Sequence, residues 1–149
     1  MELYETQAWP EQQVPYPKTP TVMLYEGARM THWGWPAEAN RSDFPAHFFL
    51  QRVKLHLVPQ GDDVPEGRHT LNPAVDAPLP PGVAALKAIS DYLRAMREFI
   101  FDTIKRQGID PVAKSILWCL TVPAIWTDAA KDTMIQAAQY AGDDDVEPL

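Results

Sequence analysis

The strongest constraint on the fold is a short apolar run that ends at a proline and is followed at once by a helix signal. Residues 116–122 favour strands and show no alternation of polar and apolar positions. This pattern predicts a strand buried on both faces, as in an α/β sheet. Pro123 cannot donate to a strand ladder and therefore ends the strand. Thr127 or Asp128 can then accept hydrogen bonds from the free N–H groups of a new helix.

The helix that follows carries one narrow apolar stripe. The stripe recurs at spacings of four, three and four residues and consists of Ala130, Met134, Ala137 and Ala141. This rhythm is typical of a helix with one buried face. Gly142 suits the left-handed position just beyond the helix end. The expected order is strand, proline, capped helix and glycine stop.

A longer helix is predicted over residues 83–107. Its apolar positions follow the same rhythm, at Ile89, Leu93, Met96 and Ile100. Lys105 and Arg106 suit the negative end of the helix dipole, and Gly108 ends the helix.

The first half of the chain is rich in proline. The chain has 15 prolines in 149 residues, about twice the usual ~5%, and most lie in this half, which predicts many loops. Residues 21–25 predict a strand, and Glu26-Gly27 turns the chain into a returning strand over 30–35, so that a hairpin is expected. Pro36 opens a polar stretch over 37–43.

A further helix is predicted over residues 44–57. Phe49, Val53 and Leu57 recur every four residues, Asp43 can cap the helix, and Pro45 suits its first turn. The whole chain, 1–149, is expected to form a single partial domain. It divides into a hairpin and helix over 1–57, a Pro-rich connector over 58–82, a helix-strand-helix segment over 83–142 and an acidic tail over 143–149.

Bulk properties exclude several classes of function. The net charge of −7 argues against a nucleic-acid-binding surface, which is normally basic. No apolar run approaches the ~20 residues that span a bilayer, so no membrane partner is expected. The first residues have neither a basic leader nor an apolar core, and the chain has one cysteine. These features predict a cytoplasmic location.

Few residues suggest chemistry by themselves. The four histidines are scattered without metal-ligand spacing, so no metal site is expected. Cys119 lies within the apolar run without a basic neighbour in sequence, which favours a packed structural cysteine over a nucleophile. No pair of carboxylates stands out, and the five tryptophans are expected in packing. These residues alone predict an α/β domain and no catalytic residue.

Residues 120–131 read Leu-Thr-Val-Pro-Ala-Ile-Trp-Thr-Asp-Ala-Ala-Lys and lead to Ala141-Gly142. This segment resembles the heat-shock protein 70 family, in which a strand ends in Thr-Val-Pro-Ala and a helix that opens with Asp closes on Ala-Gly. The Ile-Trp pair resembles divergent, mostly fungal and animal relatives with an actin-like ATPase domain. Shorter matches at 18–22 with Trp33-Gly34, at 49–57, and at 78–82 with 88–93 are collinear with it, so the resemblance covers residues 9–142.

The resemblance implies part of the first lobe of an actin-like (ribonuclease-H-like) ATPase domain. In the family, ATP and Mg²⁺ are held by two Gly-rich loops, an Asp-x-Gly-Thr-Thr type and a Gly-Gly-Gly-Thr type, and neither occurs in this sequence. The family also places a catalytic lysine after the glycine turn, where this chain has Glu38. A carboxylate there would repel a transferring phosphoryl group, and Arg41 could substitute only if the loop shifted. No cofactor is therefore expected on the isolated chain.

The resemblance also implies an interdomain relay. It would involve Pro123, Asp128 at the helix start, and Lys131, where the family has an arginine that offers bidentate geometry. The simpler interpretation is that Pro123 ends a strand and Lys131 is a solvated helix charge. Both interpretations remain open at this point.

Three functional hypotheses follow. The first is a catalytically silent fragment of a heat-shock-70-like chaperone ATP-binding domain. The second is a non-enzymatic interaction module that recruits other protein chains through the exposed edge of the incomplete sheet. The third is an unrelated small enzyme, which would need a pocket with convergent polar groups.

Overall fold

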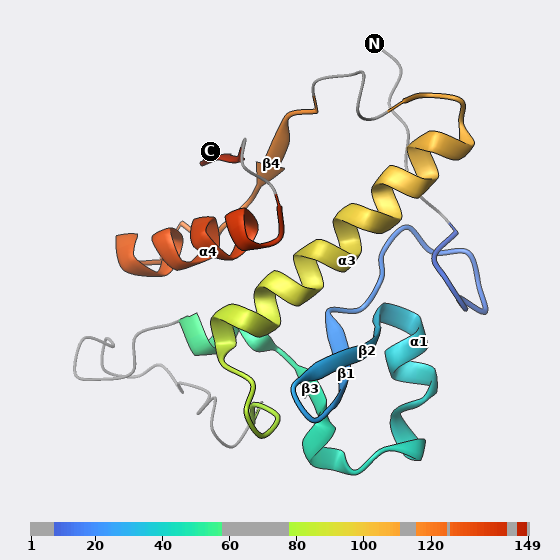
Figure 1. The fold of residues 1–149 in the computed structure, drawn as a ribbon, viewed down its shortest axis with the longest axis vertical. Helices are drawn as coiled ribbons and strands as arrows, with labels where there is room; N and C mark the ends of the chain where they lie inside the picture. Colours follow the sequence, from blue (N-terminus) through green and yellow to red (C-terminus); the bar gives the residue numbers. More distant parts are fainter. Residues whose placement is uncertain (1–7, 58–77, 111–115, 125, 143–145, 149) are drawn as a thin grey trace. The chain divides into compact units, whose positions relative to one another are not determined.

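The computed structural model describes residues 8–57, 78–110, 116–124, 126–142 and 146–148 (Figure 1). The chain forms two compact units. The N-terminal unit comprises Met1–Leu55 and Leu71–Val83, and the C-terminal unit comprises His56–Thr70 and Ala84–Leu149. The single partial domain over 1–149 stays a prediction. Most of the predicted 58–82 connector, residues 58–77, lies outside the described residues.

The N-terminal unit is built on a three-stranded antiparallel sheet in the order β2-β1-β3. Its strands are β1 (Val22–Glu26), β2 (Arg29–Trp33) and β3 (Phe49–Gln51). Central β1 is buried from Val22 to Tyr25, because it has a neighbour on each edge. The predicted hairpin is confirmed, and Gly27 makes its turn with a φ of 60°.

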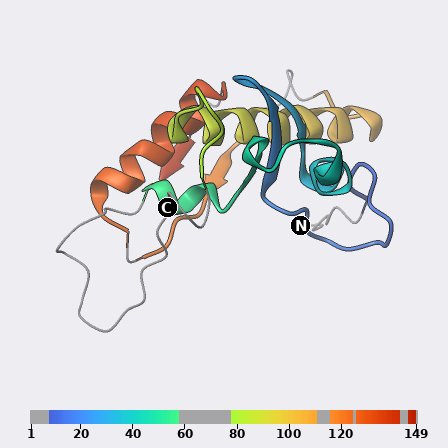
Figure 2. The same ribbon diagram turned by 90° about the horizontal axis from the view of Figure 1, so that it is seen from below.

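A short helix, α1 (Gly34–Ala39), follows β2 without a gap and packs against β1 and β2 (Figure 2). The helix includes Trp35, which the sequence predicts in the returning strand, and the beginning of the predicted polar stretch over 37–43. Gly34 makes the change of direction possible, since it is buried and has a φ of 64°. Ala37 joins Val22, Leu24 and Phe49 in the core of the unit.

The helix predicted over 44–57 is wrong. The segment instead contains 3₁₀ turns at Ala46–Phe48 and Val53–Leu57 with β3 between them, and a further 3₁₀ turn at Arg41–Asp43 precedes it. Pairing of β3 with β1 supplies backbone hydrogen bonds that compete with a helix, and Arg52 has a φ of 54°, outside the helical region. The four-residue recurrence nevertheless located buried side chains, because Phe49, Val53 and Leu57 are all buried.

The C-terminal unit contains two helices, α3 (Ala85–Arg106) and α4 (Asp128–Tyr140), which lie against each other. Both predicted helices are confirmed. Gly108 and Gly142 follow their ends with φ values of 79° and 93°. The predicted stripe of α4 is buried throughout, with Met134 2% exposed.

Two short parallel strands complete this unit, β4 (Trp118–Leu120) and β5 (Val146–Pro148). Helix α4 lies between them in sequence. The predicted strand over 116–122 was too long, and its burial on both faces is wrong, because exposure alternates along it. Leu117 is 67% exposed, whereas Trp118 is half-buried and lies 5.9 Å from the Phe101 ring of α3. Packing on one face gives the period of two.

Within the acidic tail predicted over 143–149, residues 146–148 form the short strand β5. The other tail residues lie outside the described part of the chain. An α/β class is confirmed: the N-terminal unit has an antiparallel sheet with a helix, and the C-terminal unit has a parallel pair with two helices.

Candidate functional site

Glu38 is an exposed carboxylate on α1. Its Oε1 lies 3.9 Å from Nη1 of Arg41, and the two side chains are 42% and 54% exposed. The Arg41 guanidinium also lies over the Phe49 ring, 4.4 Å from its centroid. An exposed pair of this kind contributes little to stability. The position where the resemblance implies a lysine therefore carries a solvent-exposed negative charge.

A hollow of about 480 Å³ lies beside Glu38 in the N-terminal unit; we call it the α1 hollow. Trp35, Glu38 and Ala39 form one side of it, since positions three and four apart share a helix face. Residues 11–16 form the other side. Among the described residues that line it, the charged ones are Glu11 and Glu38, and the aromatic ones are Tyr16 and Trp35.

The loop opposite α1 is held by the side chain of Gln12. Its Oε1 accepts from the Trp9 backbone N–H at 3.0 Å, and its Nε2 donates to the Tyr16 carbonyl at 2.8 Å. Trp35 Nε1 donates to the Lys18 carbonyl at 3.3 Å, which ties α1 to the end of this loop. Sequence reasoning missed the hollow, because an irregular loop has no periodicity from which to place it.

The three residues of the implied relay lie around the start of α4. Thr127 is the cap, since its Oγ1 accepts from the Ala130 N–H at 3.3 Å. Asp128 and Lys131 come together on the first turn, with Nζ and Oδ1 3.2 Å apart. Pro123 is exposed, and its carbonyl accepts from the Trp126 N–H at 3.1 Å. The relay itself stays a prediction.

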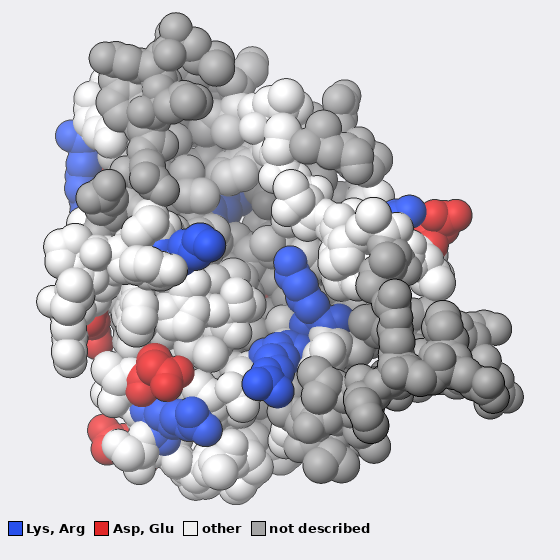
Figure 3. Space-filling model, turned by 180° about the vertical axis from the view of Figure 1, so that it is seen from behind, with Lys and Arg blue, Asp and Glu red and all other residues white. Residues whose placement is uncertain are grey.

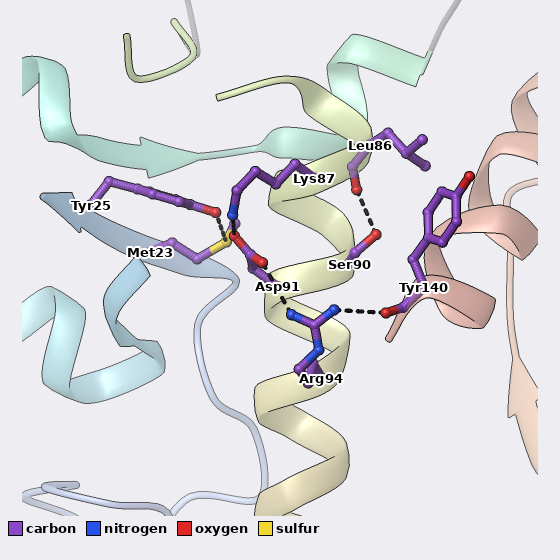
Figure 4. Close-up of polar contacts among 8 residues, drawn as sticks. All are labelled: Met23, Tyr25, Leu86, Lys87, Ser90, Asp91, Arg94 and Tyr140. Atoms are coloured by element: carbon purple, nitrogen blue, oxygen red, sulfur yellow. Dashed lines mark hydrogen bonds and ion pairs between the residues drawn. The ribbon is translucent and has the colours of Figure 1, made fainter. Parts of the chain in front are cut away.

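A polar cluster joins α3 to the end of α4 (Figure 4). Arg94 donates from Nη2 to the Tyr140 carbonyl at 2.7 Å, and its Nη1 lies 3.5 Å from Asp91. Lys87 lies one turn earlier and also pairs with Asp91. A cation at the last carbonyls of a helix satisfies acceptors that have no partner within the helix. The cluster therefore fixes the position of the α4 C-terminus against α3. In the sequence, the spacing of residues 87, 91 and 94 indicates the ion pairs within α3.

Cys119 is exposed, so the prediction of a packed structural cysteine is wrong. It is the exposed residue of β4, between Trp118 and Leu120, which are half-buried. It also lines a smaller hollow of about 190 Å³ between α3 and β4, together with Arg97 and Ile100. The Arg97 guanidinium lies over the Phe101 ring at 4.4 Å.

Within the described residues, no group of three or more His, Cys, Asp or Glu side chains could hold a metal ion. His32 and His47 instead lie against Phe44 and Phe48, at centroid distances of 6.0 and 4.2 Å. The α1 hollow is lined by no histidine, cysteine or serine in the described part of the chain. The described lining of the α1 hollow therefore offers the small-enzyme hypothesis no serine or cysteine nucleophile paired with a histidine.

The tryptophans serve packing in part, as expected: Trp126 is buried, and Trp9 meets Trp33 edge-on at 6.5 Å. On the face shown in Figure 3, basic and acidic side chains are interspersed among uncharged ones. No helix among the described residues is long and apolar enough to cross a membrane.

The chain is similar to curated heat-shock proteins. It is 30% identical to Heat shock 70 kDa protein 12A of Mus musculus over 132 residues, which is 84% of this chain. The same protein of Homo sapiens gives 30% over 132 residues, and Heat shock 70 kDa protein 12B of Homo sapiens gives 28% over 136 residues, or 87% of this chain. No protein-family model and no solved structure matches the chain.

These relatives are much longer proteins, and the chain spans 19% of their length. The likeness to heat-shock 70 proteins that residues 120–142 indicate is thus supported across most of the chain.

Proposed function

We propose that this chain is a segment of the ATP-binding domain of a heat-shock-70-like protein, from the first lobe of an actin-like fold, and that it binds no ATP by itself. The observation that carries the proposal is the identity of 28–30% over 84–87% of the chain. The order of hairpin, long helix, strand, proline and capped helix agrees with that lobe.

The residues present do not fit a bound Mg²⁺-ATP. The resemblance assigns the phosphates to two Gly-rich loops whose motifs are missing from this sequence. Glu38 is exposed at the position of the family lysine, and Glu11 lines the hollow beside it. Two carboxylates repel a polyphosphate rather than neutralise it. We therefore derive no catalytic step for the isolated chain.

Titration of the 149-residue chain with a fluorescent ATP analogue and Mg²⁺ tests the proposal. We expect no saturable binding in the micromolar range. The Glu38→Lys variant is the matched control, and it should remain silent because the loops are still missing. Micromolar, Mg²⁺-dependent binding by the parent chain would overturn the proposed inactivity. A gain of binding by Glu38→Lys would place the defect in that one residue.

A second candidate is an interaction module, and the exposed start of β4 favours it. Leu117 is 67% exposed, and β4 pairs with β5 alone among the described strands. Apolar side chains beside an open strand edge can recruit another chain. Size-exclusion chromatography with light scattering tests this idea, together with pull-downs. A monomer that captures nothing would count against it.

Localisation belongs to the same proposal. We expect this heat-shock-70-like segment to lie in the cytoplasm. Imaging of a fluorescently tagged chain tests this, and accumulation in the secretory pathway would contradict it.

A further inference from the structure

We propose that the α1 hollow binds the guanidinium group of an arginine side chain in a basic peptide. The proposal does not depend on the nucleotide chemistry discussed above. It rests on the lining of the hollow, on the way in which its walls are held, and on the charge of the chain.

The lining matches a planar organic cation. Glu11 and Glu38 supply carboxylates, and Tyr16 and Trp35 supply aromatic rings. A guanidinium group pairs with carboxylates through two parallel N–H bonds and stacks on aromatic faces, so it uses both kinds of group at once. Rings also attract cations through the negative charge of their faces. An anionic ligand would be repelled by the two carboxylates, and a purely apolar ligand would gain nothing from them.

The size of the hollow favours a peptide over a lone cation. A volume of about 480 Å³ exceeds what one side chain fills and lies within the range of ligand sites, roughly 300–1,000 Å³. Val14 and Pro15 add apolar wall beside the charged groups, and Val14 is 71% exposed. Residues that flank the arginine can cover this wall.

The walls are held before any ligand arrives. Gln12 bridges Trp9 and Tyr16 through its amide, and Trp35 is hydrogen-bonded to the Lys18 carbonyl. Because these walls are already ordered, less conformational entropy is lost when a ligand binds. Glu11 has a φ of 53°, a conformation that non-glycine residues rarely adopt. Such outliers collect at binding sites, where the surrounding structure holds them.

The neighbouring Arg41 does not fill this role. Its guanidinium lies over the Phe49 ring and only 3.9 Å from Glu38 Oε1, at the outer limit of an ion pair. An exposed pair of this kind is weak, so Glu38 remains able to accept from a second cation. The net charge of −7 also favours the approach of a basic ligand.

Fluorescence anisotropy with a labelled Gly-Ala-Arg-Ala-Gly peptide tests the proposal on the full 149-residue chain. The same peptide with citrulline in place of arginine is the matched ligand control, because citrulline keeps the shape and loses the charge. We expect binding of the arginine peptide that weakens as salt is raised, and about tenfold weaker binding of the citrulline peptide. Equal binding of both peptides, or no binding of either, would overturn the proposal.

Variants then locate the site. Glu11→Gln and Glu38→Gln should each weaken binding about two- to fivefold, and together about tenfold, as expected for exposed charge pairs. Glu98→Gln makes the same change of charge at an exposed position of α3 and should leave binding unchanged. An equal loss in all three variants would show that net charge, and not the hollow, attracts the peptide.

Free argininamide is the last arm of the experiment. Competition by argininamide at concentrations far above that of the peptide supports a guanidinium site with peptide contacts around it. Competition at equal concentrations would refute the peptide part, since the flanking residues would then add nothing.

Discussion

Gly34 lies where the sheet of the N-terminal unit gives way to α1, and a single methyl group there should be costly. The residue is buried and has a φ of 64°. A Cβ at this position would collide with the Oγ1 of Thr19 and lie 3.7 Å from the Thr19 Cβ. The Gly34→Ala variant therefore combines two separate penalties, backbone strain and overpacking.

The energetic costs of the strain and of the overpacking can be estimated separately. An L-residue in the left-handed region costs roughly 1–2 kcal/mol. Extra methyl groups in a packed site cost about 1–3 kcal/mol. Together they should lower the free energy of unfolding by about 2–5 kcal/mol, a large share of the roughly 5–15 kcal/mol that a domain possesses.

Gly27 provides the matched control, because it has a φ of 60° and, apart from its chain neighbours, no atom lies within 4 Å of the place that an alanine Cβ would occupy. Gly27→Ala should show the strain alone, about 1–2 kcal/mol. Urea unfolding followed by circular dichroism measures both variants. In a Thr19→Ala background, Gly34→Ala should cost no more than Gly27→Ala does. Equal losses for the two alanine variants in the parent background would refute the reasoning about Thr19.

Three further predictions concern single residues. Met134→Ala should lower the free energy of unfolding by about 2–5 kcal/mol, since the side chain is 2% exposed, whereas the same change at a solvent-facing methionine would cost little. Thr127→Ala removes the cap of α4 and should cost about 0.5–2 kcal/mol, with Thr127→Ser restoring most of it; an unchanged urea midpoint would contradict the cap. Arg52→Gly should raise the free energy of unfolding by about 0.5–1 kcal/mol, because φ is 54° and glycine relieves the strain; a loss of stability would show that the contacts of the arginine side chain matter more.

The helices of the C-terminal unit could be predicted because their signals are local. The stripe of α4 and the glycines after each helix depend on neighbours within one or two turns. The cap at Thr127 is a contact between residues three apart. Such contacts form in any context that allows a helix, so the sequence alone is enough to locate them.

The wrong predictions concern residues whose conformation or burial depends on contacts with residues far away in the sequence. Phe49, Val53 and Leu57 have helical spacing, yet Phe49 pairs with Leu24 of β1. Exposure of Cys119 depends on β4 being covered on one face, which no local pattern reveals. The hollow depends on a loop that Gln12 closes through two hydrogen bonds of its side chain. Of the candidate site, the charge at Glu38 was visible in the sequence, and its aromatic surroundings were not.

The parallel pairing of β4 with β5 has a consequence for the order of folding. Parallel neighbours cannot be joined by a tight hairpin, so α4 must be formed and turned back before Trp118 can meet Val146. Closing so long a loop has an entropic cost that three paired residues repay only in part. The backbone amides of this pair should therefore be protected last during refolding and should exchange with solvent earlier than those of α3 or β1.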